Sequence, residues 1–237
     1  MLANKKTARA TGILYLVIFF ANVFAFFFVT ERLILPGDAA GTASNILANE
    51  GLYRGAIVSY LLVFLSDIAV AILLYQLLRP VNQTIAAIAT ATRLMQTAVH
   101  GVNLINLVFP LLLLTGGSAL SDFSATQLNA GALLFLDAHH YGVLISEAFF
   151  AVSTLLLAYL VYRSELFPAL LGILLAIASL GYFLDSFVFF LLPQYEAVLV
   201  SVMQPMAVVG ELSFTIYLLV KGVRLARRPT PAAVATA

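Results

Sequence analysis

The sequence contains no cysteine, which excludes a disulfide framework, a thiolate metal site and a cysteine nucleophile. Charge is also scarce, because only 10% of the 237 residues are charged, whereas a soluble domain carries about 25%. The net charge of +1 offers no case for nucleic-acid binding, since the basic residues lie at the edges of apolar segments. With 62% hydrophobic residues, the chain is predicted to lie in a lipid bilayer.

Six apolar segments reach the roughly 20 residues that a helix needs to cross a bilayer. They cover residues 10–30, 55–78, 84–114, 137–162, 167–192 and 197–221. The first is longer than the apolar part of a signal peptide, about 7–15 residues, so we expect it to be retained. The sequence therefore predicts an all-α polytopic membrane protein, a bundle of six transmembrane helices. We expect residues 1–228 to form this single membrane domain and 229–237, rich in Pro and Ala, to form a disordered tail.

The distribution of Lys and Arg predicts the orientation of the chain. One side of the membrane carries Lys5, Lys6, Arg9, Arg79, Arg163, Lys221, Arg224, Arg227 and Arg228. The other side carries only Arg32 and Arg54. Because positive loops stay inside, both termini are predicted to be cytoplasmic, in a multi-pass protein of the inner (plasma) membrane.

Two outer loops are predicted to contain short interfacial helices. Asp38 follows Pro36-Gly37 and is a good N-cap for a helix that ends near Gly51. Ser124 and Gln127 form a capping box ahead of residues 128–136. In the preceding span, Pro110 predicts a kink or an early stop.

Ionisable side chains inside the predicted spans are the most informative feature of the sequence. They are Asp67, Arg93, His100, His139, His140, Glu147, Asp185 and Glu211. Burying such a group in hydrocarbon costs at least ~2.5–3.5 kcal/mol, so these groups pair, face a bundle interior or serve function. They mark where a site is to be sought.

Helical spacing groups several of these residues into polar stripes. The stripe of the third span is Arg93, Gln96, His100 and Asn103. The stripe of the fourth span is Asp137, His140, Leu144 and Glu147. His139 is expected to point away from the second stripe. Because lipid offers polar groups no partner, both stripes must face the bundle interior.

The predicted depths place these residues in one polar cavity. Counting ~1.5 Å per residue from the cytoplasmic ends puts Arg93 at roughly 13 Å and Asp185 at roughly 27 Å. We therefore predict a cavity, mostly in the outer half of the membrane, lined by the second to sixth spans. Its predicted lining is Asp67, Arg93, Gln96, His100, Asn103, Glu147, Asp185 and Glu211.

Arg93 has two readings. It is either a structural charge neutralised by Asp67 or Glu211 at similar depth, or a ligand for an anionic substrate. In either case one arginine faces four deep carboxyl groups. The surplus carboxyl groups must be protonated, hydrogen-bonded or metal-bound, which favours a cavity with a function.

A metal site is a further possibility. His100, His140 and Glu147 have the types of ligand that zinc or iron takes in a two-histidine, one-carboxylate site. A depth difference of roughly 9 Å between the two histidines weakens this reading and the alternative of axial haem ligation. The sequence also contains no H-E-x-x-H motif.

Short matching pieces along almost the whole chain, about residues 8–222, resemble a known family. They are Ala8–Tyr15, Leu35–Ala39, Asn45–Ile46, Glu50–Gly51, Leu78–Asn82, Leu136–His139, Tyr162–Ser164, Gly181–Ser186 and Gly210–Glu211. As a set they resemble the bacterial membrane family called domain of unknown function 4386. The resemblance implies a multi-span protein of the bacterial inner membrane, with no substrate, reaction or catalytic residue to carry over.

Three functions remain open on the sequence. The first is binding or transport of a small solute or ion, coupled to protons through Glu147, Glu211 and Asp67, for which a homodimer is expected because six spans are few. The second is a metal-dependent intramembrane hydrolase acting on a lipid-like substrate. The third is a non-catalytic structural or regulatory subunit, although interhelical polar pairs average only ~0.6 kcal/mol in membranes.

Overall fold

The computed structural model describes residues 5–224, apart from several side chains between 193 and 204. All regular elements in this part are helical, as predicted. They are α1 (Lys5–Val23), a π-helical segment (Phe24–Thr30), α2 (Glu31–Leu33), α3 (Ala39–Ala48), α4 (Glu50–Leu78), α5 (Gln83–Asn103), α6 (Ile105–Thr115), two short 3-10 turns (Gly117–Leu120 and Pro193–Tyr195), α7 (Ala125–Arg163), α8 (Ala169–Leu191) and α9 (Glu196–Val220). The predicted tail, 229–237, lies outside the described residues.

Five helical stretches of the described chain are long and apolar enough to cross a membrane. They are Lys5–Leu33, Glu50–Leu78, Gln83–Thr115, Ala125–Arg163 and Ala169–Leu191. The predicted span 197–221 corresponds to α9, and its fully described stretch, Pro205–Val220, is an apolar helix shorter than the ~20 residues of a full crossing. The chain is therefore a multi-pass membrane protein with five candidate spans, and the sixth crossing stays a prediction.

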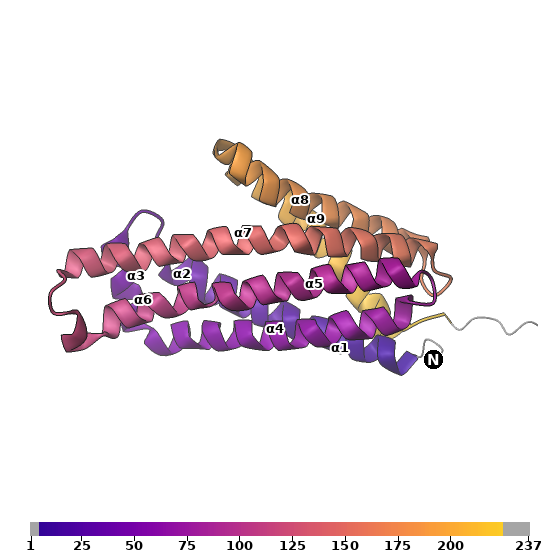
Figure 1. The fold of residues 1–237 in the computed structure, drawn as a ribbon, viewed down its shortest axis with the longest axis horizontal. Coiled ribbons are helices and arrows are strands. Elements are labelled where there is room, and N and C mark those ends of the chain that lie inside the picture. The colour runs from indigo at the N-terminus through magenta and orange to yellow at the C-terminus, as the bar shows by residue number, and fades with distance from the viewer. Residues whose placement is uncertain (1–4, 225–237) are drawn as a thin grey trace, which may run out of the picture.

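The long helices close into a ring. Around the ring the neighbours are α1, α4, α5, α7, α8 and α9, and α9 packs back on α1. Figure 1 shows α4, α5 and α7 running side by side along the long axis, with the C-terminal end of α8 tilted away from α7. Each of these helices therefore has one face toward the centre of the ring.

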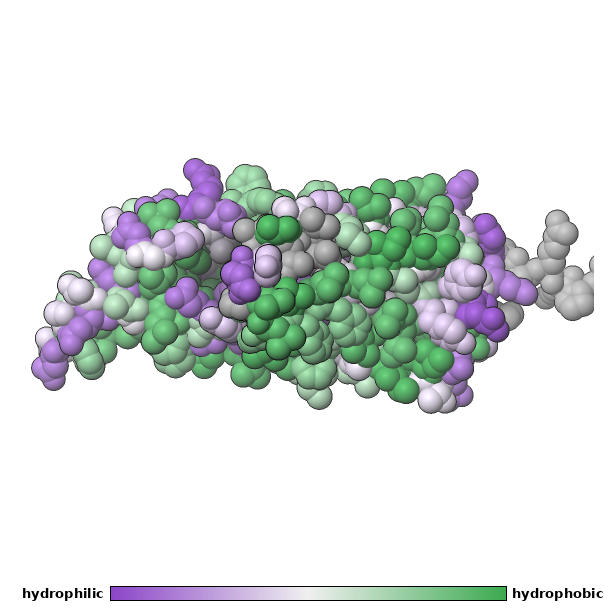
Figure 2. Space-filling model, turned by 90° about the horizontal axis from the view of Figure 1, so that it is seen from above, coloured by the Kyte–Doolittle hydropathy of each residue, from purple (hydrophilic) through white to green (hydrophobic). Residues whose placement is uncertain are grey.

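Both ends of the described chain lie at the same end of the molecule (Figure 1). Lys5, Arg79, Arg163 and Lys221 lie at helix termini at this end, which we call the basic end. Figure 2 shows hydrophobic residues over the middle of the molecule and hydrophilic residues gathered at both extremities. A lateral surface of this kind is stable in contact with lipid.

Helix α7 corrects one prediction. The capping box at Ser124 is present, with Gln127 N donating to Ser124 Oγ at 3.3 Å and Ser124 N donating to Gln127 Oε1 at 2.9 Å. It begins the 39-residue α7 and not a separate interfacial helix, so that prediction was wrong. No helix breaker separates residues 128–136 from the span that follows. At ~1.5 Å per residue α7 is about 58 Å long, so part of it projects beyond a ~30 Å hydrocarbon layer.

The other two local predictions were close. Asp38 caps α3 through a bond from Gly41 N to Asp38 Oδ1 at 2.8 Å, and α3 ends at Ala48, just before the predicted Gly51. The third predicted span is interrupted, as expected, but at Leu104, ahead of Pro110, which stays inside α6.

The apolar core falls into two clusters along the bundle. One, near the basic end, includes Leu77, Leu160 and Phe214. The other, near the far end, includes Ile46 on α3 and Leu107 on α6. On α4 the last member of the far cluster is Phe64 and the first of the basic-end cluster is Val70, and the buried residues Ser66 and Asp67 between them mark a polar layer that separates the two clusters.

Candidate functional site

Asp67 and Arg93 form an ion pair at the centre of the polar layer. The Arg93 Nε and Nη2 atoms donate to Asp67 Oδ1 at 3.0 and 2.5 Å, which joins α4 to α5. Thr97, one turn after Arg93, donates its hydroxyl to Asp67 Oδ2 at 2.7 Å. Arg93 is 3% exposed and Asp67 5%, so both charges are satisfied inside the protein. This ion pair corresponds to the first of the two predictions for Arg93, a structural charge neutralised by Asp67.

Aromatic rings enclose the guanidinium of Arg93. Its Cζ atom lies 5.3 Å from the ring centre of Tyr15 on α1 and 5.0 Å from that of Phe150 on α7. Both distances are within the ~6 Å range of a cation–π contact. The arginine therefore connects four helices of the ring, and its head is occupied by Asp67 and by two aromatic faces.

Glu211 and Tyr182 bring α9 and α8 to the same layer. The Tyr182 hydroxyl donates to Glu211 Oε1 at 2.9 Å, and the Tyr182 ring lies edge-on to Phe150 at 4.9 Å. Glu211 is also within electrostatic range of Arg93 and Asp67. The predicted cavity residues Asp67, Arg93 and Glu211 thus lie in one interacting group, although Glu211 is bonded to a tyrosine and not to the arginine.

Glu147 and Asp185 form a carboxyl pair between α7 and α8. Asp185 and Glu211 both lie within electrostatic range of Glu147. The Glu147 Oε2 atom is buried and has no hydrogen-bond partner among the described residues. Glu147 therefore keeps one acceptor oxygen unused.

The histidines nearest the far end form a second polar group. His100 contacts Gln96 Nε2 through Nδ1 at 3.0 Å and stacks on Phe64, with ring centres 5.4 Å apart. Asn103 Nδ2 donates to the His139 carbonyl oxygen at 2.8 Å and lies 3.1 Å from its ring Nδ1. The predicted stripe of Gln96, His100 and Asn103 thus faces α7 and α4.

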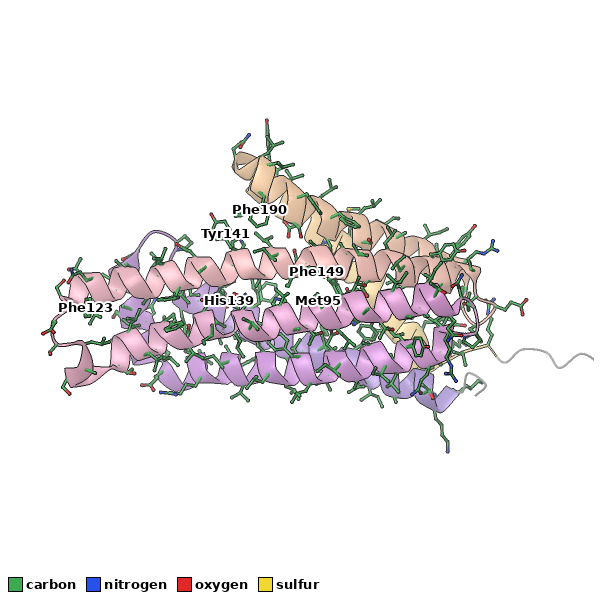
Figure 3. The ribbon with its side chains drawn as sticks, viewed as in Figure 1. Met95, Phe123, His139, Tyr141, Phe149 and Phe190 are labelled. Carbon is green, nitrogen blue, oxygen red and sulfur yellow. The ribbon has the colours of Figure 1, made fainter. Side chains whose placement is uncertain are left out.

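His139 points away from the stripe of the fourth predicted span, as expected. Helix α7 packs on both α5 and α8, so it has two inward faces, and adjacent residues lie about 100° apart on a helix. His139 lies on the side toward α5, whereas the next residues turn toward α8 and Phe190 (Figure 3). His140 is exposed and packs edge-on against Phe189 at 5.3 Å.

The predicted metal ligands are distributed over different contacts. His100 interacts with α5 and α4, His140 with α8, and Glu147 with Asp185. In the part of the chain that the structure describes, no three His, Asp or Glu side chains are grouped to hold a metal ion. The zinc or iron site and the haem alternative stay predictions that this arrangement does not support.

A small pocket of about 20 Å³ reaches Arg93 from the basic end. It lies between α4, α5 and α7, and its lining includes Tyr75, Thr90, Arg93 and Ser153. That volume is enough for about one water molecule. The sequence predicted a cavity in the outer half of the membrane, whereas this pocket lies on the basic-end side of Arg93.

Several residues of the site escaped the sequence analysis. Tyr15, Thr97 and Tyr182 carry no charge, and tyrosine and threonine are common in spans. The available signal was spacing, since Thr97 is four residues after Arg93 and Tyr182 three before Asp185, which places each on the face of its ionisable neighbour.

Residues 10–222 match the family described as domain of unknown function (DUF4386), so the chain belongs to that family. It is also 28% identical to an uncharacterised protein of Archaeoglobus fulgidus over 171 residues, which cover 72% of this chain and 85% of the relative. No solved structure matches the chain.

Proposed function

We propose that this DUF4386 member binds a small cation or cationic solute inside the helix ring and exchanges it for protons. The observation that carries the proposal is the carboxyl surplus. One carboxylate, Asp67, neutralises Arg93, while Glu147 and Glu211 lie in the same polar layer without a hydrogen bond to a cationic side chain among the described residues. Carboxyl groups near the middle of a membrane are the usual coupling sites of proton-linked transporters.

The arrangement around Arg93 argues against an anionic substrate. An anion would have to displace Asp67 from two charge-assisted hydrogen bonds and enter between the rings of Tyr15 and Phe150. A cation meets no such obstacle at the unpartnered oxygen of Glu147. It would replace a proton on the Glu147 carboxyl group, so that one positive charge is exchanged for another and the local charge stays constant.

Glu147 is the residue to which the proposal assigns cation contact. Its buried Oε2 atom lacks a partner in the described chain and is available to a ligand. The rings of Tyr182 and Phe150, which lie 4.9 Å apart beside Glu211, provide further surface for a cation. The proton would leave Glu147 when the cation binds and return to it when the cation is released.

The ring geometry supports the predicted topology. The ring is closed by the contact between α1 and α9, and both ends of the described chain lie at the basic end. We therefore propose that α9 makes the sixth crossing and that the basic end faces the cytoplasm. Each helix of the ring contributes a residue to the polar layer, so the proposed site is complete in one copy, and a homodimer is not needed to build it.

Proteoliposomes containing a pH-sensitive dye test the function. The full chain is reconstituted, and pulses of Na⁺, K⁺ and ethidium are applied across the membrane. At least one pulse is expected to move protons in the natural protein, and Glu147→Gln should reduce the signal to that of protein-free liposomes. Asp137→Asn, an exposed carboxylate on the same helix, is the matched control and should behave like the natural protein. Equal proton movement in Glu147→Gln would refute the proposal.

The structural-subunit reading has one observation in its favour. The Asp67–Arg93–Thr97 group joins helices by satisfied hydrogen bonds and leaves Arg93 no role as a ligand. This reading predicts that no cation pulse moves protons in any variant. The hydrolase reading gains no comparable support from the described side chains, since they form no group of three ligands.

A further inference from the structure

A cleft of about 430 Å³ opens at the basic end, between the start of α1 and the end of α9. Its lining is Lys5, Tyr217, Lys221, Val223 and Arg224. Three of these residues are cations, and the tyrosine contributes a hydroxyl group that can donate a hydrogen bond. Such a concentration of donors and positive charge in one concave surface suits a phosphate group.

The end of α9 gives the cleft a defined wall. The Lys221 and Gly222 N–H groups both donate to the Tyr217 carbonyl oxygen, at 2.9 and 3.0 Å. Gly222 has a φ of 71°, which turns the chain out of the helix at this point. A Cβ atom on Gly222 would lie 3.4 Å from the Lys5 Cβ atom, so the turn packs directly on the start of α1.

The residues after the turn are also held in place. The Arg224 N–H donates to the Leu166 carbonyl oxygen at 2.9 Å, which attaches this segment to the connection between α7 and α8. Val223 is buried beneath it. The backbone that carries Lys221 and Arg224 is thus fixed on both sides, and the cations are not on a loose terminus.

We propose that this cleft binds the phosphate headgroup of an anionic phospholipid. The cations provide the charge, and basic pockets at the cytoplasmic edge of helix bundles are suited to such headgroups. Next to the cleft, Ile216 and Val220 on the last turns of α9 are exposed, large and apolar. They offer a path for the acyl chains along α9, which a free phosphate ion does not need. The assignment uses no residue of the polar layer and is independent of the proposed transport.

Native mass spectrometry of the detergent-purified full chain tests this assignment. Phosphatidylglycerol is titrated and compared with phosphatidylcholine, which has a phosphate but no net charge. The natural protein is expected to retain one phosphatidylglycerol more tightly. Replacing all three cations, as Lys5→Gln, Lys221→Gln and Arg224→Gln together, should weaken phosphatidylglycerol binding at least about tenfold.

A matched variant removes the same charge from the same end of the molecule but outside the cleft. It combines Lys6→Gln, Arg79→Gln and Arg163→Gln, all exposed positions. Phosphatidylglycerol binding should be retained, whereas an equal loss would overturn the proposal in favour of a general surface charge effect. If the triple variant does not fold, the single variant Lys221→Gln replaces it in the test. Its binding of phosphatidylglycerol is expected to be about threefold weaker than that of the natural protein.

Inorganic phosphate separates the two sources of a phosphate group. The natural protein is equilibrated with phosphatidylglycerol, and sodium phosphate is then added while ionic strength is held constant with sodium chloride. Retention of the lipid supports the proposal, because the acyl chains contribute to binding. Displacement by phosphate at concentrations comparable to that of the lipid would overturn it and make the cleft a free-anion site.

Discussion

At the scale of the residue, Asp67 and Arg93 show how a buried charge is accommodated in this chain. Each was expected to need a partner, and the structure pairs them across α4 and α5 with Thr97 as a third member. Neutral polar pairs in membranes average only ~0.6 kcal/mol, since their partners find other bonds when one is removed. A buried guanidinium enclosed by Tyr15 and Phe150 has far less freedom to do so.

Asp67→Asn is therefore expected to destabilise the protein by about 3–5 kcal/mol, because it leaves the Arg93 charge uncompensated. Replacing both partners, as Asp67→Leu with Arg93→Leu, should recover most of that loss, since no charge is then stranded. Unfolding in a denaturing detergent, followed by circular dichroism, measures both. Glu50→Gln is the control, because its pair with Arg54 is exposed and exposed pairs contribute about 0–1 kcal/mol. A double variant less stable than Asp67→Asn would contradict this account.

The remaining carboxyl groups were predictable in number from the sequence, but their partners were not. Counting one arginine against four deep carboxyl groups predicted a surplus, and that count needs only the sequence. Which partner each group has depends on distances across helices, and the bond between Tyr182 and Glu211 was not predictable from spacing within either helix. His139 shows the same limit: helical spacing separated it from His140, but its contact with Asn103 depends on the packing of α7 against α5.

At the scale of the element, α7 is defined by a start signal and the absence of a stop. The capping box at its start was predicted correctly. The predicted boundary between an interfacial helix, 128–136, and a span, 137–162, is not present in the structure. Hydropathy indicates whether a helix is surrounded by water or by lipid, but it does not indicate where the helix ends. The helix therefore passes from the aqueous region into the membrane without a break.

Gly142 sets how closely α7 approaches α5. A Cβ atom at this position would overlap the Asn103 side-chain amide that bonds to His139. Gly142→Ala is expected to separate the helices and destabilise the protein by about 1–3 kcal/mol. Gly101→Ala is the matched control, because open space surrounds that helical glycine and the change should be neutral or stabilising by up to about 1 kcal/mol. Thermal melting of the two variants measures the difference, and equal melting temperatures would show that the close approach is unimportant.

At the scale of the whole molecule, the helices close into a ring in which α9 packs back on α1. Both ends of the described chain lie at the basic end, which is compatible with α9 as a crossing. The fully described stretch of α9, Pro205–Val220, is apolar, and a labelling experiment tests whether the helix crosses the membrane.

Cysteine labelling can establish the topology, because the natural chain has no cysteine to interfere. Arg54→Cys and Arg79→Cys mark opposite ends of α4, and Tyr195→Cys marks the start of α9. A membrane-impermeant maleimide should label positions 54 and 195 in intact cells and position 79 only after lysis. Labelling of position 79 in intact cells would reverse the orientation, and protection of position 195 would contradict the sixth crossing.

The sequence by itself determined that this is an all-helical, multi-pass membrane protein with ionisable groups on the inward faces of its spans. Composition and helical period are local properties, so they can be read without knowing which helices meet. Tertiary structure alone decided the order of helices around the ring, and with it the pairing of Asp67 with Arg93 and of Glu211 with Tyr182. Partners more than 25 residues apart in the chain become neighbours only through packing, because no local pattern encodes the distance between two helices.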